Sequence, residues 1–496
     1  MNSQETKVES RKTSYQKRKT FFALFAIFFA LFSCNPSITT DPTAKLTFST
    51  DTVCFDTVFT AQGSATSILM VYNTEKKAIH IDRISLQNGS ASPFHLNIDG
   101  LTNSESVSED ITLESNDSLF IFVRVNIDPT DSLTPVFVSD RILFSFNDKT
   151  QTVELEAFGQ DVEIIRSTIF RNDTTLSGKK PYLIYDYAAI DTAKTLTIAA
   201  GSRFYFHDKA QLVVFGNLIA QGTLEQPITM QSDRIDHLFT QVPYSMVAGR
   251  WDGLYLVQIA DRPEAHYDIN YLETQSGAVG LYCINRDPQN LHPSLRLYNS
   301  MIHNFNHYGL VLQDIDAQIV NCQISNCAQY CVYLAGGKHD FIHTTIASYY
   351  NNTDVRIQST PREDMAAVYI NDLYKTTQQM QTSFYNSIIM GVRSNQLVLA
   401  TPFEEQYKGV FSHCYLRNDS ISLPQFSDIT YYQKEDTVFK NVFYKYKEYI
   451  NYDFTLDSVS PCLNIADTAV SRLYPLDRRG RNRFDDQHPD LGCYEL

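Results

Sequence analysis

The chain has 496 residues, a formal net charge of −15 at pH 7 and a hydrophobic content of 43%. Its length allows two or three domains, and its hydrophobic content is sufficient for a substantial core. The acidic balance, with no basic stripe along the sequence, excludes nucleic acid as an expected partner and disfavours adsorption to anionic lipid.

The N-terminal segment, residues 1–33, is predicted to be an export signal. Six basic residues precede an unbroken apolar run, Phe21–Phe32, whose twelve residues are fewer than the ~20 that a membrane-spanning helix needs. The run ends in the sequence LFSC, which resembles the end of a bacterial lipoprotein signal. The resemblance implies that Cys34 becomes the lipid-bearing first residue of the mature chain. The alternative is uncleaved export with a free cysteine.

Removing the signal makes the chain more acidic. It takes away six of 41 basic and two of 56 acidic residues, so the net charge becomes −19. Residues 34–44 are polar and aperiodic and therefore predict a tether.

Residues 45–160 are predicted to form a β-sandwich. Short alternating runs are separated by turn residues at sandwich-like spacing. These runs are Leu69–Tyr72, Ile79–Ile84, Phe94–Ile98, Leu119–Val125, Arg141–Phe146 and Val153–Phe158. The sequences ILMVYNTEKKAIHIDRISL, Ile68–Leu86, and SPFHLNI, Ser92–Ile98, resemble immunoglobulin-like domains of the ASPM/SPD-2/Hydin type.

Residues 162–450 contain two repeated motifs that predict a β-solenoid with coils of about 22 residues. The first motif is LYNSMI at Leu297–Ile302, IVNCQI at Ile319–Ile324, FIHTTI at Phe341–Ile346, FYNSII at Phe384–Ile389 and FSHCYL at Phe411–Leu416. The second is GLYL at Gly253–Leu256, GLYC at Gly280–Cys283, GLVL at Gly309–Leu312, CVYL at Cys331–Leu334 and AVYI at Ala367–Ile370. Two interleaved strand motifs per coil favour a flattened solenoid. A polar insert, Asn351–Asp364, separates two of the coils.

The opening and closing segments point to one architecture. Lys194–Met230 resembles the opening coils of right-handed parallel β-helices, and residues 451–496 resemble the tail that closes many bacterial β-helices. Together with the signal and the sandwich, they resemble exported right-handed parallel β-helix lipoproteins of Bacteroidetes, with a pectin-lyase-like fold. That family has no established activity, so the resemblance implies an all-β architecture and a location. A cap on the solenoid is expected because its last strand leaves an unpaired edge.

The third residue of the first motif predicts a polar ladder at one turn of the solenoid. Stacked side chains there would satisfy each other and the turn backbone. The ladder residues are Asn299, Asn321, His343, Asn386 and His413. A role for either histidine as a base or metal ligand is the less favoured alternative. His303 with His307 and His339 with His343 have zinc-like spacing, but they fall on strands and turns, so we expect neither a metal nor another cofactor.

The middle residue of the second motif is the most suggestive candidate for binding. Its neighbours on both sides are apolar, so strand alternation directs it outward. This column contains Tyr255, Tyr282, Val311, Tyr333 and Tyr369. The four tyrosines predict a flat aromatic ladder suited to a neutral glycan. Two alternatives remain open: tyrosine simply favours strands, or the insert Asn351–Asp364 covers the ladder.

The cysteines give one candidate disulfide. Cys322 and Cys414 occupy equivalent positions of the first motif, about 14 Å apart at ~4.8 Å per strand, which is too far for a bridge. The remaining pair near the C-terminus, Cys462 and Cys493, is the only pair considered for one.

These features predict a lipid-anchored cell-envelope protein with a non-catalytic β-helix that binds a polysaccharide or an envelope protein. Surface-displayed lipoproteins of the kind that this chain resembles often carry an acidic cluster directly after the cysteine, whereas the first acidic residue here is Asp41, seven residues on. The resemblance therefore implies the periplasmic face of the outer membrane rather than the cell surface. One alternative is a polysaccharide lyase or glycoside hydrolase of the pectin-lyase-like fold, although no stacked column of Asp or Glu is found. Another is a structural component of an envelope complex.

Overall fold

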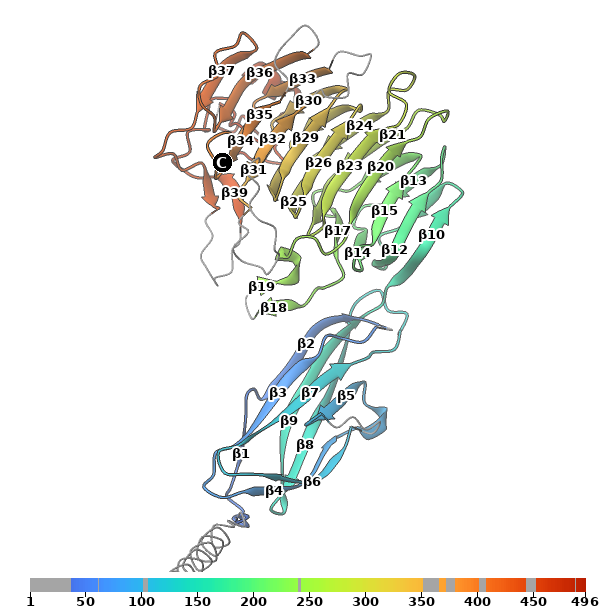
Figure 1. Cartoon of the computed structure of the whole chain (residues 1–496), viewed down its shortest axis with the longest axis vertical. Coiled ribbons are helices and arrows are strands. Elements are labelled where there is room, and N and C mark those ends of the chain that lie inside the picture. The colour runs from blue at the N-terminus through green and yellow to red at the C-terminus, as the bar shows by residue number, and fades with distance from the viewer. Residues whose placement is uncertain are drawn as a thin grey trace, which may run out of the picture. The chain divides into compact units, whose positions relative to one another are not determined.

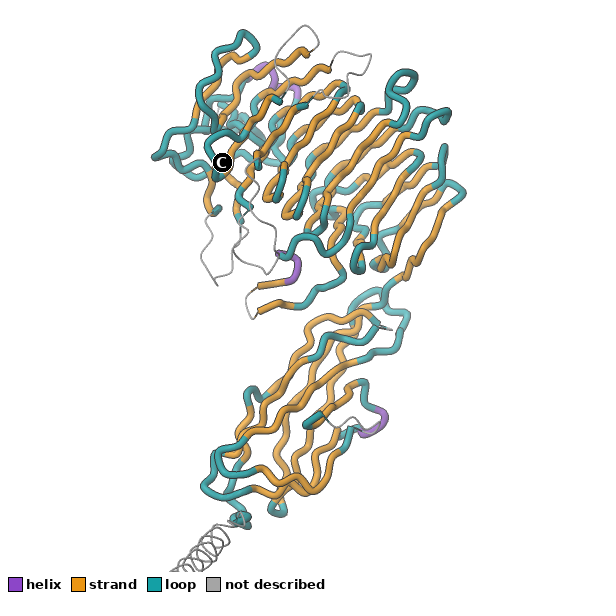
Figure 2. Tube along the Cα trace, viewed as in Figure 1, coloured by secondary structure: helices purple, strands orange, loops and turns teal. Residues whose placement is uncertain are grey.

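The computed structural model describes residues 37–60, 62–100, 106–239, 242–350, 365–371, 380–400, 407–442, 452–486 and 488–496 (Figure 1). Contacts divide the chain into two units, one made of 1–128 with 136–159 and one made of 129–135 with 160–496. Strands make up almost all of the regular structure described (Figure 2). Cys34 and the insert Asn351–Asp364 lie outside the described residues.

The first unit is a β-sandwich of two sheets. One sheet has the order β1(Leu46–Phe48), β3(Ser67–Asn73), β7(Ser118–Val125), β5(Phe94–Ile98). The other has the order β2(Thr52–Phe59), β9(Lys149–Gln160), β8(Val136–Phe146), β4(Ile79–Leu86), β6(Ser108–Leu113), and a short 3-10 turn, η1(Gly89–Ala91), follows β4 in the sequence. The strands of the first sheet pair antiparallel, as do β9, β8, β4 and β6 of the second. Alternate residues such as Leu69, Val71, Ile121 and Phe144 fill a fully buried core. This arrangement is immunoglobulin-like, as predicted.

The second unit is a parallel β-helix in which three strand columns, here sheets A, B and C, repeat along one axis. Sheet A contains β15(Gln211–Val214), β20(Gly253–Gln258), β23(Val279–Asn285), β26(Tyr308–Gln313), β29(Tyr330–Ala335), β32(Ala366–Ile370) and β35(Leu397–Leu399). Sheet B contains β11(Thr174–Leu176), β13(Thr195–Ile198), β16(Asn217–Gln221), β21(His266–Asn270), β24(Ser294–Tyr298), β27(Asp316–Val320), β30(Lys338–Ile342), β33(Met380–Tyr385) and β37(Phe426–Tyr431).

Sheet C completes each coil. It contains β14(Arg203–Phe206), β17(Ile228–Ser232), β22(Leu272–Gln275), β25(Met301–Phe305), β28(Gln323–Cys327), β31(Thr345–Ser348) and β34(Ile388–Gly391). Four strands run through a corner and join two sheets: β10(Glu163–Phe170) and β12(Tyr182–Ile190) join C to A, and β36(Tyr407–Leu416) and β37 join B to C. The stacked strands pair in parallel throughout.

Each described coil therefore has three strands rather than the two that the sequence motifs indicated. The first motif spans two strands: Leu297 and Tyr298 end β24, and Met301 and Ile302 begin β25. Asn299, between them, has φ of 50°, and this left-handed residue turns the chain at once without a loop. A corner this short makes two strands look like one continuous motif in the sequence.

The interior of the β-helix is packed by stacked side chains. Phe341, Phe384, Phe411 and Phe426 pair in register on sheet B, with centroid distances of 4.5, 5.1 and 4.4 Å between successive rings. On the coils nearer the N-terminus, Trp251 stacks on Phe206 at 4.1 Å and donates its indole N–H to the Gln275 carbonyl at 2.8 Å. Such stacks bury large aromatic surfaces at strand spacing.

The remaining elements lie outside the coils. A hairpin of β18(His237–Phe239) and β19(Val242–Pro243) precedes a 3-10 turn, η2(Tyr244–Met246). Near the C-terminus, β38(Phe439–Asn441) pairs antiparallel with β39(Asp453–Leu456), and α2(Thr468–Leu473) follows, capped by the Asp467 carboxylate. No helix among the described residues is long and apolar enough to cross a bilayer.

The C-terminal closing segment, Asp453–Leu496, packs along the side of the solenoid, not only at its end. Cys493 N–H donates to Thr345 Oγ1 of β31 at 3.1 Å, and Tyr494 Oη donates to Gln323 Oε1 of β28 at 2.6 Å. Arg478 reaches Glu273 of β22 at 2.6 Å. The segment therefore covers part of the outer surface of sheet C across several coils.

Candidate functional site

The predicted tyrosine column lies in register on sheet A. Tyr255 pairs with Tyr282, Tyr282 with Val311, Val311 with Tyr333 and Tyr333 with Tyr369. Residues on either side of each, such as Leu254 and Leu256, are fully buried, whereas the four tyrosines are partly exposed. The column therefore points outward. Val311 is only 2% exposed, because its shorter side chain is covered by its neighbours.

Two tyrosines that the sequence analysis missed enlarge this column. Tyr308 pairs with Tyr330 at the start of β26 and β29, and both rings contact Tyr333 at 5.9 and 6.1 Å. Tyr330 also stacks on Tyr369 at 4.5 Å, and Tyr333 on Tyr369 at 5.6 Å. We call Tyr308, Tyr330, Tyr333 and Tyr369 the tyrosine platform. Tyr255 and Tyr282 form a separate pair, 5.7 Å apart.

The platform is not the flat ladder that the sequence suggested. The planes of Tyr333 and Tyr369 differ by only 9°, so the rings stand side by side and face each other along the solenoid axis. Strand side chains project roughly perpendicular to the sheet. The platform therefore offers ring edges and phenolic oxygens, which suit hydrogen bonding to hydroxyl-rich ligands together with apolar contact.

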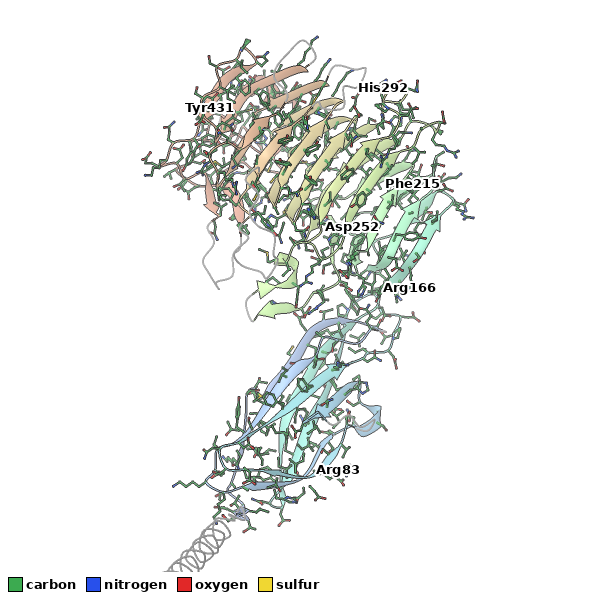
Figure 3. The ribbon with its side chains drawn as sticks, in the orientation of Figure 1. Arg83, Arg166, Phe215, Asp252, His292 and Tyr431 are labelled. Atoms are coloured by element: carbon green, nitrogen blue, oxygen red, sulfur yellow. The ribbon has the colours of Figure 1, made fainter. Side chains whose placement is uncertain are left out.

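Figure 3 shows how densely side chains cover both units, with Asp252 labelled just before β20. Asp252 lies near the Tyr255 phenol. The pKa of Tyr255 is raised, mainly because the phenol is buried and secondly because the Asp252 carboxylate is negatively charged. Tyr255 is therefore a neutral hydrogen-bonding group at physiological pH and not a base.

The five predicted ladder residues occupy one corner between sheets B and C. Their φ angles lie between 49° and 54°, a conformation that Asn and His tolerate better than most residues. Asn321 Nδ2 donates to Asn299 Oδ1 at 3.2 Å, and Asn386 Nδ2 lies 3.1 Å from His343 Nε2. His343 is fully buried, its Nε2 lies 2.9 Å from Ser471 Oγ, and burial lowers its pKa well below the usual value. A buried neutral imidazole is suited to a structural role.

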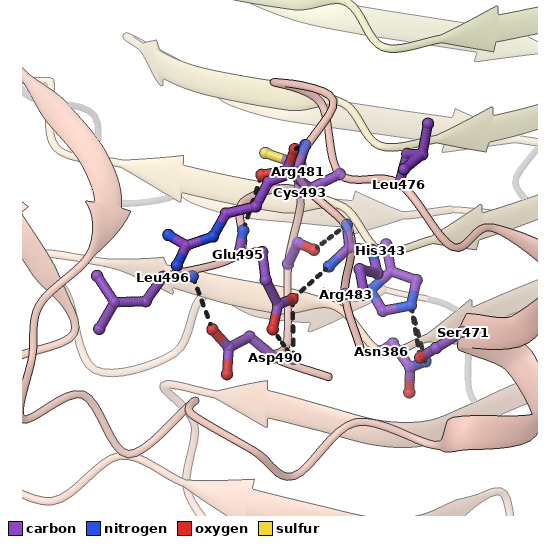
Figure 4. Close-up of polar contacts among 12 residues, drawn as sticks. His343, Asn386, Ser471, Leu476, Arg481, Arg483, Asp490, Cys493, Glu495 and Leu496 are labelled. Atoms are coloured by element: carbon purple, nitrogen blue, oxygen red, sulfur yellow. Dashed lines mark hydrogen bonds and ion pairs between the residues drawn. The ribbon is translucent and has the colours of Figure 1, made fainter. Parts of the chain in front are cut away.

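The closing segment joins this corner through a buried polar cluster (Figure 4). Arg483, which is fully buried, donates to Asn321 Oδ1 at 3.0 Å and to the Gly492 carbonyl at 3.1 Å. Its second nitrogen lies 3.3 Å from Glu495 Oε2. Burial raises the pKa of Glu495 to about 8 in spite of this partner, and burial also raises that of Asp490. Desolvation thus outweighs the attraction of the guanidinium.

This cluster gives the closing segment a pH dependence. The folded chain keeps a proton on Glu495 that the unfolded chain loses near its ordinary pKa of 4.5. Stability is therefore expected to be fully present below about pH 4.5 and to fall as pH rises towards 8, with Asp490 acting in the same sense. Hydrogen exchange of Asp453–Leu496 at pH 5 and pH 8 measures this. Glu495→Gln should flatten the profile, and protection that increased with pH in wild type would contradict it.

The predicted disulfide is absent. Cys462 and Cys493 are free, buried thiols. Their surroundings differ: Cys493 lies beside Thr345 and the Arg478 guanidinium, whereas Cys462 lies beside Ser460 and Asp490. Burial raises the pKa of both thiols, which disfavours the reactive thiolate.

The histidines with zinc-like spacing do not converge. On sheet C, His303 Nδ1 lies 2.9 Å from Ser325 Oγ. On sheet B, His339 Nδ1 lies 3.1 Å from Thr382 Oγ1. Within the described ranges, no group of three or more His, Cys, Asp or Glu side chains is arranged to hold a metal ion. Burial lowers the pKa of His303 to about 4 and that of His339 to about 3.

No protein-family model and no curated protein matches this chain. A family 123 glycoside hydrolase from Clostridium perfringens aligns at 9% identity over 24% of this chain and 28% of its own, with a TM-score of 0.18. An ASH/PapD-like domain of human CEP192 aligns at 14% identity over 25% of this chain and 90% of its own, with a TM-score of 0.17. The chain thus covers less than a third of the hydrolase. At these TM-scores neither likeness bears on function.

Proposed function

We propose that this protein is a lipid-anchored, non-catalytic component of a bacterial cell envelope that binds a neutral glycan through the tyrosine platform. The single observation that carries the proposal is the gathering of Tyr308, Tyr330, Tyr333 and Tyr369 on the outer surface of sheet A. Aromatic edges and phenolic oxygens complement the hydroxyl and C–H groups of a sugar. The chain's net charge of −15 favours a neutral glycan over an anionic one.

The binding mode follows from the direction of the coils. Strands of sheet A stack along the axis at ~4.8 Å, so a glycan lying along this axis meets successive rings of the platform. The Tyr255–Tyr282 pair lies on the same surface beyond Val311 and extends the contact for a longer chain. In this proposal the sandwich acts as a spacer between the membrane anchor and the β-helix.

Removing the platform rings is expected to abolish most glycan binding. The double change Tyr330→Ala and Tyr333→Ala should weaken retention on a neutral-glycan array by roughly tenfold or more, because each lost aromatic contact is worth about 0.5–1.5 kcal/mol. Tyr333→Phe keeps the stacking and removes only one hydroxyl, so it should have a smaller effect. Release of reducing or unsaturated ends should be measured in parallel.

The matched control is Tyr72→Ala, which removes an exposed tyrosine from the sandwich. Its retention should equal that of wild type. Unchanged binding in the double variant, with thermal unfolding also unchanged, would exclude the platform as the binding surface. Glycan cleavage by wild type would instead support the lyase or hydrolase alternative.

The anchor is tested at Cys34. The sequence LFSC and the polar tether that follows support lipidation at this residue. Cys34→Ser is expected to move the protein from the membrane fraction to the soluble fraction, because stable attachment requires the acyl chains. Mass spectrometry of the mature N-terminus checks the modification directly. An unmodified Cys34 in a membrane-bound wild-type protein would contradict it.

A further inference from the structure

Four side chains with complementary chemistry form a row where sheet C turns into sheet A in the first coils. Arg166 on β10 pairs in register with Tyr185 on β12, and His207 and Asp233 directly follow the paired residues Phe206 and Ser232. The Arg166 guanidinium lies 3.8 Å from the Tyr185 ring centroid, and the Tyr185 and His207 rings are 4.7 Å apart. His207 Nδ1 lies 2.7 Å from Asp233 Oδ2.

The Arg166 guanidinium is stacked but has no carboxylate partner. Arg234 provides the comparison: it stacks on Tyr244 at 3.9 Å in the same way, but two of its nitrogens also bind the two oxygens of Asp236, each at 2.7 Å. Arg166, by contrast, forms no ion pair with any residue of the described part of the chain. A guanidinium held flat against a ring keeps its in-plane N–H donors available for an oxyanion.

His207 adds a second polar group to the row. Asp233 occupies its Nδ1, so Nε2 is the ring nitrogen left for a ligand, and the histidine side chain is 50% exposed. The Asp233 side chain is only 12% exposed, and its contact with Nδ1 fixes the orientation of the His207 ring. The Tyr185 ring lies between the Arg166 guanidinium and the His207 imidazole. Asp186, which directly follows Tyr185, accepts a hydrogen bond from Ser167 Oγ at 2.7 Å.

We propose that Arg166, Tyr185 and His207 form a binding site for an oxyanion group, a carboxylate, sulfate or phosphate, with Asp233 as the residue that positions His207. The ligand lies along the coil axis, so that the guanidinium, the phenol and the imidazole contact it in succession. This site is distinct from the tyrosine platform, which belongs to later coils of sheet A, and it goes beyond the proposed function. The oxyanion group that binds there belongs either to an acidic sugar of a glycan or to a free inorganic anion.

Calorimetric titration of the full chain at low ionic strength with glucuronate, inorganic sulfate and inorganic phosphate tests the site. Wild type should bind at least one of them saturably. Arg166→Ala should weaken this binding roughly tenfold or more, because a charge-assisted hydrogen bond is lost. Arg166→Lys keeps the charge without the planar fork and should fall between the two. His207→Asn should also weaken binding.

Two control variants distinguish binding at this site from a general effect of surface charge and from binding at the tyrosine platform. Arg296 is an exposed arginine that lies 5.0 Å from the Tyr298 ring and already pairs with Asp268 at 3.7 Å. Arg296→Ala should therefore leave anion binding unchanged. Tyr333→Ala should also leave it unchanged, which makes the result independent of the platform. Tighter binding of glucuronate than of phosphate identifies a glycan as the source, and the reverse identifies a free anion. Absence of saturable binding for all three, or equal binding by Arg166→Ala, overturns the proposal.

Discussion

Replacing Arg483 by methionine is expected to detach the C-terminal closing segment from the solenoid, at a cost of about 3–5 kcal/mol. Arg483 is fully buried, and its guanidinium joins the Gly492 carbonyl and Glu495 of the segment to Asn321 of the corner ladder. Methionine fills similar volume but leaves these acceptors buried without a donor, which costs about 1–3 kcal/mol for each. Hydrogen exchange of Asp453–Leu496 and thermal unfolding measure the effect.

Arg479→Met is the matched control, because Arg479 is exposed and its guanidinium forms no ion pair with the described residues, although it lies 4.9 Å from the ring of Tyr494. It should change stability by less than about 0.5 kcal/mol. Adding Glu495→Gln to Arg483→Met should recover part of the loss, because it removes the unpaired carboxyl group. Wild-type exchange rates in Asp453–Leu496 of the Arg483→Met variant would show that the guanidinium does not hold the segment.

The architecture was predictable because a solenoid repeats its local chemistry. The corner residues Asn299, Asn321 and Asn386 recur at the same motif position, since few residue types tolerate their positive φ. Alternation around Tyr282 and Tyr333 correctly placed these side chains outward, since their neighbours must fill the interior. Each inference depended only on residues close in the sequence or one coil apart.

The third strand of each coil and the tyrosines Tyr308 and Tyr330 were missed for a local reason. Strict alternation back from Tyr333 would put Cys331 outside, but Cys331 and Val332 are both fully buried, because the strand leaves a corner there. Tyr330 therefore lies on the outer surface, although the alternation of the strand would place it inside. The 22-residue spacing of Tyr308 and Tyr330 was the available signal.

The polar cluster of the closing segment was not predictable from the motifs. Arg483 meets Asn321 across 162 residues, and Tyr494 meets Gln323 across 171. No repeat relates these partners, so the sequence shows only charged residues in a tail, which ordinarily suggests solvent exposure. The Cys462–Cys493 disulfide was also predicted from proximity in the sequence, and the structure has both as free thiols with different neighbours.

Phe384→Ala is expected to destabilise the coils around β33 by about 3–5 kcal/mol. The Phe384 ring is fully buried and stacks between Phe341 at 4.5 Å and Phe411 at 5.1 Å, with ring planes within 7° of parallel. Removing it opens a cavity inside sheet B and breaks two ring contacts at once. Because each coil of a solenoid contacts mainly its neighbours, the loss should be local. Hydrogen exchange resolved by strand measures both its size and its extent.

Exchange should accelerate in β30, β33 and β36, which carry the three rings, and remain at wild-type rates in β13 to β17, several coils away. Phe137→Ala in the sandwich, where the ring is 50% exposed, is the control and should cost much less. Phe384→Leu should restore most of the stability, because it refills the cavity. Uniform acceleration throughout the β-helix would mean that its coils unfold as one cooperative unit. In that case Phe384→Ala would also weaken glycan binding at the tyrosine platform strongly. If the loss of stability is local, binding should weaken only to the extent that β29 and β32, which neighbour the affected coils, are disturbed.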